Sequence, residues 1–190
     1  ELNVRKVERV LTTDGKKKSL AWVNAASGRN RINREPNDFD RDVVRKVISA
    51  LRDTPLWIPS DEIDPAGYSA KLAQLGNKAI TDVSKFLSER NRLVFADLWQ
   101  RMAEINDASI RNAIRSCLTS IFTVISERQG YFGGGGGMSG NLYMPIVRME
   151  KNIYDSLRRK IKKFIDAESE KPRNHEGHLV TTQSATKLDE

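Results

Sequence analysis

The 190-residue chain lacks the residues from which several classes of protein are built. It has one cysteine, Cys117, so it can form neither an internal disulfide nor a zinc site made of thiolates. It has no apolar run near the ~18 residues that a membrane-spanning helix needs, and its first residues do not resemble a signal peptide. We therefore expect a cytoplasmic protein with no membrane partner, a compartment that also suits a lone reduced thiol.

The chain has an excess of positive charge. It contains 32 Lys and Arg against 25 Asp and Glu, which gives a formal net charge of +7. With 38% hydrophobic residues it is too apolar for full disorder, and its charge favours an acidic partner, with nucleic acid as the first candidate. The length corresponds to about one domain. Because the first residue is not methionine, we expect the chain to be part of a longer protein.

Apolar periodicity predicts a mainly α-helical fold, a helical bundle with a small N-terminal β-hairpin. β-rich runs on both sides of Asp14-Gly15 predict the hairpin, and a polar connector follows over residues 27–37. Apolar residues at helical spacing predict helices over about 39–52, 89–105, 107–128 and 148–167, which should share one core. We divide the chain into the hairpin and connector at 1–36, a helical domain at 37–167 and a polar tail at 168–190.

The predicted helix over 148–167 has an apolar side and a basic side. At about 100° per residue, its apolar residues from Met149 to Phe164 fall within one sector. The cations on the opposite side, called the basic ridge below, are Arg148, Lys151, Arg158, Arg159 and Lys162. Asp155 interrupts this ridge. A phosphate-binding face and an ordinary solvated face both explain the pattern.

A glycine-rich loop precedes this predicted helix. Seven of the twelve glycines lie between Gly130 and Gly140, and five of them are consecutive: Gly133, Gly134, Gly135, Gly136 and Gly137. Consecutive amides without side chains can cradle an anion. The loop lacks the Gly-Lys-Ser/Thr of a Walker loop, and a helix rather than a strand is predicted before it, so neither a Walker site nor a dinucleotide site is supported. We expect an adaptable loop, with nucleotide binding as a further alternative.

Catalytic groups are scarce. The two histidines, His175 and His178, lie in the polar tail, and no third metal ligand stands at usable spacing from them. No nucleophile with an adjacent base and no carboxylate pair on a rigid element can be recognised. We therefore assign no catalytic residue and no metal site.

Four segments carry motifs that one family of known proteins shares. Within the run Lys85–Trp99, the residues that match the family pattern are Arg90, Leu93, Ala96, Leu98 and Trp99, while Glu89 stands where a proline is usual. The second segment is Ser139-Gly140-Asn141-Leu142-Tyr143-Met144-Pro145, which is similar to the family's Ser-Gly-Thr-Leu-Tyr-hydrophobic-Pro. The third comprises Glu150, Asn152 and Ile153, which match Glu-x-Asn-Val/Ile. The fourth, Gln183-Ser184-Ala185-Thr186-Lys187-Leu188, resembles the strand before the family's Asp-Pro-Pro-Tyr/Phe motif.

These four segments together resemble adenine-specific DNA methylases of prokaryotes. The resemblance covers about residues 55–190, and it implies a target-recognition insertion between the two catalytic halves of such a methylase. The S-adenosylmethionine loop and the Asp-Pro-Pro-Tyr/Phe motif are both absent from the chain, so the resemblance implies a DNA-binding fragment that does not methylate by itself. S-adenosylmethionine would be the cofactor of the parent protein, within a restriction-modification system, and the fragment itself would hold no cofactor. The implied partners are double-stranded DNA and the catalytic halves.

We expect the DNA contacts to come from the basic ridge, from the loop Gly133–Gly137, and from Arg90 and Tyr143. The alternative is a structural or protein-interaction insertion, which would brace the methylase or dock a partner subunit. In that case the exposed charges would serve only solubility. The sequence does not predict the oligomeric state.

Overall fold

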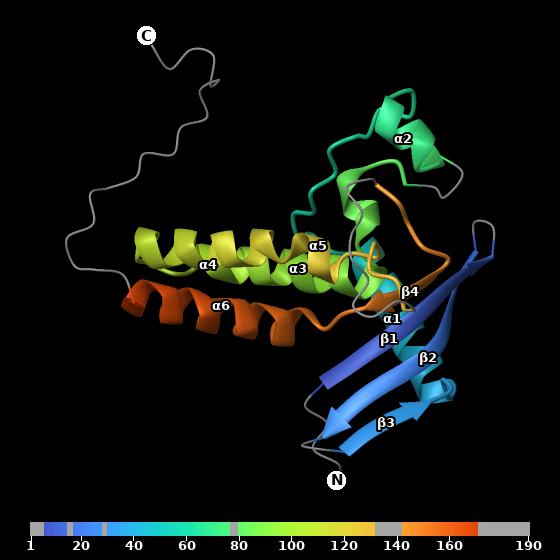
Figure 1. Cartoon of the computed structure of the whole chain (residues 1–190), viewed down its shortest axis with the longest axis horizontal. Helices are drawn as coiled ribbons and strands as arrows, with labels where there is room; N and C mark the ends of the chain where they lie inside the picture. The colour runs from blue at the N-terminus through green and yellow to red at the C-terminus, as the bar shows by residue number, and fades with distance from the viewer. Residues whose placement is uncertain (1–5, 15–16, 28–29, 77–79, 132–141, 171–190) are drawn as a thin grey trace.

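The computed structural model describes residues 6–14, 17–27, 30–76, 80–131 and 142–170, and within these ranges the fold is α+β (Figure 1). An antiparallel sheet of four strands stands beside a group of helices. The prediction of a mainly α-helical bundle with a small hairpin is therefore wrong. The elements are β1 (Lys6–Asp14), β2 (Lys17–Ser27), β3 (Asn30–Arg34), α1 (Asp38–Arg52), α2 (Tyr68–Leu72), the 3₁₀ turn η2 (Val83–Phe86), α3 (Glu89–Ala103), α4 (Ala108–Ser120), α5 (Phe122–Ile125), β4 (Val147–Glu150) and α6 (Ile153–Glu170).

The sheet has the strand order β3-β2-β1-β4. The predicted hairpin forms its centre, because β1 and β2 pair antiparallel up to Asp14 and Lys17. β3 arises from residues expected to be a polar connector, and it pairs with β2. β4 arises from residues expected to be the first turn of the last helix, and it pairs with β1. Each outer strand finds its hydrogen-bond partners on one edge of the hairpin, which explains how such short segments become strands.

The helix boundaries follow local capping signals. Asn37 and Asp40 form a capping box at the start of α1, and the side chains of Ser88 and Asp107 cap α3 and α4. The helix predicted over 107–128 is interrupted at Ile121, so it becomes α4 and α5. The helix predicted over 148–167 begins only at residue 153, as α6, and continues to residue 170.

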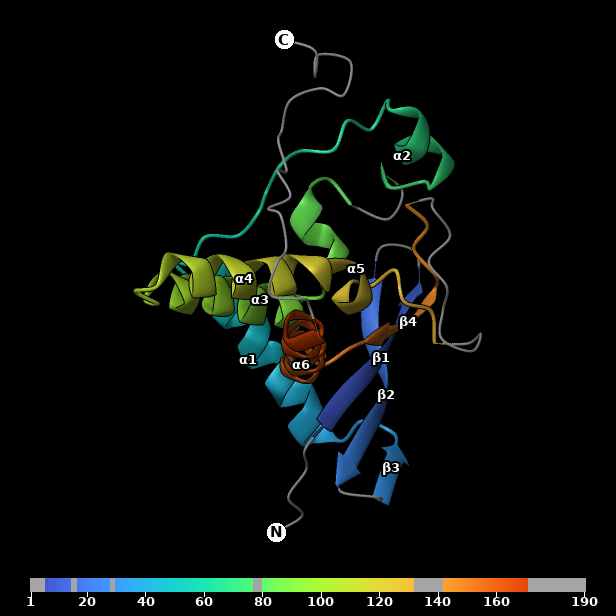
Figure 2. The same ribbon diagram turned by 60° about the vertical axis from the view of Figure 1, so that its left-hand side comes forward.

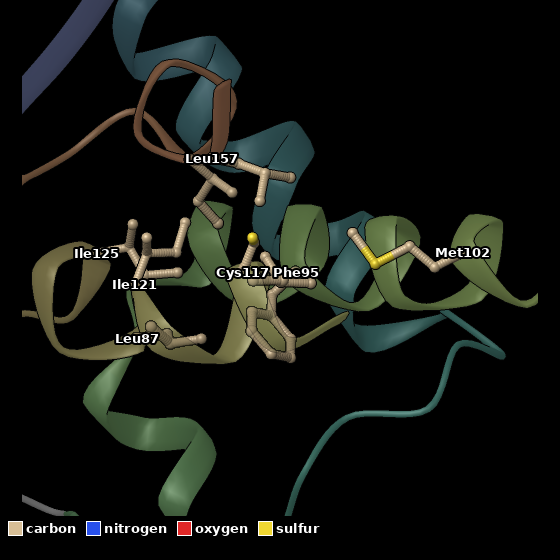
Figure 3. Close-up of a cluster of buried hydrophobic side chains, with 9 residues drawn as sticks. Leu87, Phe95, Met102, Cys117, Ile121, Ile125 and Leu157 are labelled. Atoms are coloured by element: carbon tan, nitrogen blue, oxygen red, sulfur yellow. The ribbon is translucent and has the colours of Figure 1, made fainter. Parts of the chain in front are cut away.

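The main core lies among α3, α4, α5 and α6 (Figure 3). Its buried residues are Leu87, Phe95, Met102, Cys117, Leu118, Ile121, Ile125, Ile153 and Leu157. A second cluster lies beneath α2 and includes Phe86 and Met144. α1 packs against α3 and one face of the sheet, where Val44 and Val47 lie close to Leu11 and Leu20. No helix in the described ranges is both long and apolar enough to cross a membrane.

Candidate functional site

The exposed face of α6 carries a dense group of cations. The side chains of Arg158, Arg159 and Lys162 are 83%, 58% and 76% exposed, and Ile153 and Leu157 on the opposite face are buried in the core. Lys160 and Lys163 are also exposed. Five of the six residues from 158 to 163 are therefore cations at the surface, called the α6 cations below: Arg158, Arg159, Lys160, Lys162 and Lys163.

Some of the α6 cations have acidic neighbours on the same helix. Asp155 lies 3.5 Å from Arg158 and 3.0 Å from Arg159, measured between carboxylate oxygen and Nη2. Lys162 Nζ lies 3.1 Å from Asp166 Oδ2. The pair of Lys162 and Asp166 is exposed, and exposed pairs at this spacing contribute about 0.3–0.5 kcal/mol and are screened by salt. The carboxylate of Asp155 is 17% exposed, while Arg158 and Arg159 keep most of their side-chain surface in solvent, where an incoming phosphate can reach it.

The other two residues of the basic ridge do not belong to this face. Arg148 lies on β4, opposite Leu11 of β1, and its buried side chain forms an ion pair with Glu127. Lys151 lies half-buried in the turn between β4 and α6. The expectation of one ridge along a single helix is wrong, because residues 147–150 pair as a strand and point Arg148 inward.

Two of the remaining predicted contacts, Arg90 and Tyr143, lie on segments other than α6. Arg90 is half-buried in the first turn of α3, with Nη2 3.0 Å from Glu150 Oε2 and 3.4 Å from the carbonyl oxygens of Glu150 and Lys151. Tyr143 is exposed in the extended stretch before β4. The loop Gly133–Gly137 lies outside the described residues.

A buried carboxylate, that of Glu150, lies at the end of β4, just before the start of α6 in the chain. The side chain of Glu150 is 0% exposed and faces Arg9 across the β1–β4 pairing. Arg9 donates two hydrogen bonds to it, one from Nε and one from Nη2 at 2.7 Å to Oε1. The hydroxyl of Ser88 donates a third, and Arg90 contributes an ion pair. Glu150 thus links β1, β4 and the N-terminus of α3.

A second buried carboxylate, Glu127, extends this arrangement. It pairs with Arg148 of β4 and with Lys18 of β2. Lys18 Nζ also lies 3.2 Å from Glu89 Oε1, and Glu89 in turn contacts Arg92. The complete group, called the ion network below, consists of Arg9, Lys18, Ser88, Glu89, Arg90, Arg92, Glu127, Arg148 and Glu150.

The cations of the ion network keep two of its acids, Glu89 and Glu150, charged. Burial raises the pKa of Glu150, but the charge of Arg90 and the hydrogen bond from Arg9 outweigh burial, so the pKa lies below its ordinary value. Burial likewise raises the pKa of Glu89, and the charge of Lys18 outweighs it, so this pKa is also lowered. Both acids are therefore ionised at neutral pH.

Comparison with known proteins does not identify the chain. No protein-family model, curated protein or solved structure was found to match it. The resemblance to DNA methylases therefore stays a prediction from the sequence.

The α6 cations supply positive charge at the surface, and the described part of the chain groups no residues into a metal centre. Within the described ranges, no three His, Cys, Asp or Glu side chains are grouped so that they could bind a metal ion. The structure also shows how the turn before α6 is held. The buried Asn91 donates from Nδ2 to the carbonyls of Ile125 and Lys151, at 2.9 and 3.1 Å, and so fixes the turn that leads into α6.

Sequence reasoning missed the ion network. Its one visible signal is Ser88, which precedes Glu89 as a helix cap should. The partners of this segment, Glu127 and Glu150, lie about forty and sixty residues further along the chain, so no local pattern connects them. Charged residues in a sequence suggest solvent exposure, and only the assembled sheet and helices bury these.

Proposed function

We propose that the chain binds double-stranded DNA through the α6 cations, as the target-recognition insertion of an adenine-specific DNA methylase. One observation carries the DNA-binding part of the proposal: five exposed cations occupy positions 158–163, and three of them, Arg158, Arg159 and Lys162, lie on the side of α6 away from buried Ile153 and Leu157. Lys and Arg side chains that neutralise phosphates release condensed counterions, and this release supplies most of the sequence-independent affinity for DNA.

The charge distribution along α6 limits the contact to its middle. Asp166, Glu168 and Glu170 follow the α6 cations and would repel phosphates near the end of the helix. Asp155, near its start, is mostly buried beneath Arg158 and Arg159. A duplex would therefore touch the turns formed by residues 158–163.

A rigid phosphate contact suits the chemistry of a methylase. An enzyme that modifies a base must extrude it from the duplex, and phosphate contacts hold the flanking DNA in register. The ion network and Asn91 connect the start of α6 to the sheet and to α3, so the helix that carries the α6 cations is held against the rest of the fold. The methyl-transfer residues and S-adenosylmethionine would belong to the parent protein, as the resemblance implies.

The proposal is tested by measuring the anisotropy of a labelled duplex titrated with the chain at low and moderate salt. We expect a Kd of roughly 1–100 μM, weakening steeply as salt rises. The double charge reversal Arg158→Glu/Arg159→Glu should abolish binding. Arg41→Glu/Arg45→Glu is the matched control, because both arginines are exposed on α1 and paired with acids of the same helix. Absence of binding at low salt, or equal loss in the control, would contradict the proposal.

The second candidate is a structural or protein-interaction insertion. The exposed apolar side chains of Tyr143 and Ile146, just before β4, favour it because such residues are typical of protein contacts. This function predicts no DNA binding by the chain and co-elution with the catalytic halves of the parent protein, which Ile146→Asp should disrupt.

A further inference from the structure

We propose that an aromatic groove beside α3 and α4 stacks an unpaired nucleobase. The groove has a volume of about 280 Å³ and an apolar lining, to which four aromatic rings contribute: Trp57, Phe95, Trp99 and Phe122. Both views show the segment that follows α1, which includes Trp57, on the opposite side of α3 and α4 from α6 (Figures 1 and 2). The inference rests on the proposed function, because it requires nucleic acid as the ligand.

The rings of the groove hold one another in place. Trp57 and Trp99 lie 5.7 Å apart between ring centroids, and Trp99 lies 6.2 Å from Phe95, nearly parallel to it. Phe95 meets Phe122 edge to face at 6.0 Å. Trp57 remains 56% exposed despite its contact with Trp99. Trp57 is therefore held by Trp99 and still has exposed surface. A base can stack on this platform with little loss of side-chain conformational entropy.

A cation lies over Trp99, the ring that contacts Trp57. The guanidinium of Arg115, on α4, lies 4.7 Å from the centroid of the Trp99 ring. Within the described ranges no acid pairs with Arg115, and its buried Nε has no hydrogen-bond partner. An apolar aromatic surface next to a cation without a described counterion matches the two parts of a nucleotide, the planar base and the phosphate.

The lining of the groove indicates what kind of recognition it offers. Its polar groups are limited to the hydroxyl of Thr119 and the indole N–H groups of Trp57 and Trp99. The groove therefore offers few partners for the hydrogen-bonding edge of a base, and stacking would be tolerant of sequence. A base that lies flat on Trp57 must be unpaired and outside a duplex. An acidic aliphatic peptide would meet the same net charge, but the planar rings of Trp57 and Trp99 match the flat face of a base better than a branched aliphatic side chain.

The test compares an oligothymidine strand with an abasic strand that has the same number of phosphates. Stacking of one base corresponds to roughly 5- to 150-fold in Kd, so we expect the unaltered chain to bind oligothymidine about tenfold more tightly than the abasic strand. Trp57→Ala should make the two affinities equal, and so should Trp57→Leu, which keeps an apolar side chain against Trp99. Tyr68→Ala removes an exposed aromatic ring on α2 and should leave the ratio unchanged.

Three results would overturn the inference. The first is equal affinity of the unaltered chain for the two strands. The second is an equal effect of Tyr68→Ala and the Trp57 variants. The third is binding of an acidic leucine-containing peptide at Trp57 when neither strand binds there, which would make the groove a protein-docking site. Arg158→Glu/Arg159→Glu separates this inference from the proposed function, because it should abolish duplex binding and preserve the oligothymidine-to-abasic ratio. If the unaltered chain shows the ratio but binds no duplex, the α6 interface alone is refuted.

Discussion

Replacing Glu150 by alanine removes the carboxylate on which Arg9, Ser88 and Arg90 converge. The side chain of Glu150 is fully buried and that of Arg9 nearly so, so the substitution leaves a guanidinium without its counterion in the protein interior. Breaking a buried ion pair by removing one partner costs about 3–5 kcal/mol of the free energy of unfolding. For a chain of this length, each kcal/mol corresponds to about 2–4 °C in Tm, so we expect Tm to fall by roughly 6–20 °C.

Urea denaturation followed by circular dichroism measures this loss. The matched control is Asp97→Ala, which breaks the exposed ion pair of Asp97 with Arg101 and should cost only about 0.3–0.5 kcal/mol. The double variant Arg9→Met/Glu150→Leu replaces the buried pair by apolar side chains and should recover much of the loss. A loss below about 1 kcal/mol for Glu150→Ala would show that the ion network does not couple the sheet to the helices, and would refute the reasoning.

Three further predictions concern stability and reactivity. The folded-state pKa values of Glu150 and Glu89 are lowered, so their contribution to the free energy of unfolding is complete above about pH 4.3 and is lost as the pH falls through the folded values. The free energy of unfolding should therefore decrease with acidification in that range. Urea titration of Glu150→Gln should show a smaller decrease. Leu118→Ala, at a site with no exposed surface, should cost about 2–5 kcal/mol in the same assay, and a cost below about 1 kcal/mol would contradict the described core. Burial raises the pKa of the Cys117 thiol, so a thiol reagent should label it slowly in the folded protein and quickly in urea; equal rates would contradict its burial.

The sequence predicts elements whose signals are local. The helix expected over 39–52 matches α1 closely, because its cap at Asn37 and its periodic valines lie within one segment. β4 shows the opposite case. Met149 and Ile153 stand four residues apart, as on a helix, yet residues 147–150 pair with β1 from the far end of the chain. Local periodicity carries no information about such pairing, and this is why the fold was expected to be mainly helical.

The sequence likewise predicts some features of the candidate site and not others. The exposure of Arg158, Arg159 and Lys162 follows from the helical period, since the apolar residues of α6 fix which face is buried. The burial of Arg148 does not follow from any local pattern. It depends on the pairing of β4 with β1 and on Glu127, which a separate segment brings into contact with it.

The salt dependence of duplex binding tests the DNA-binding proposal most directly. Each phosphate contact contributes about 0.9 to the slope of log K against log salt concentration, so the neutral variant Arg158→Ala/Arg159→Ala should lower that slope by about two units, to a similar extent for every duplex sequence. A slope that is the same in the variant and in the unaltered chain would show that these arginines do not contact phosphate, and would contradict the proposed interface.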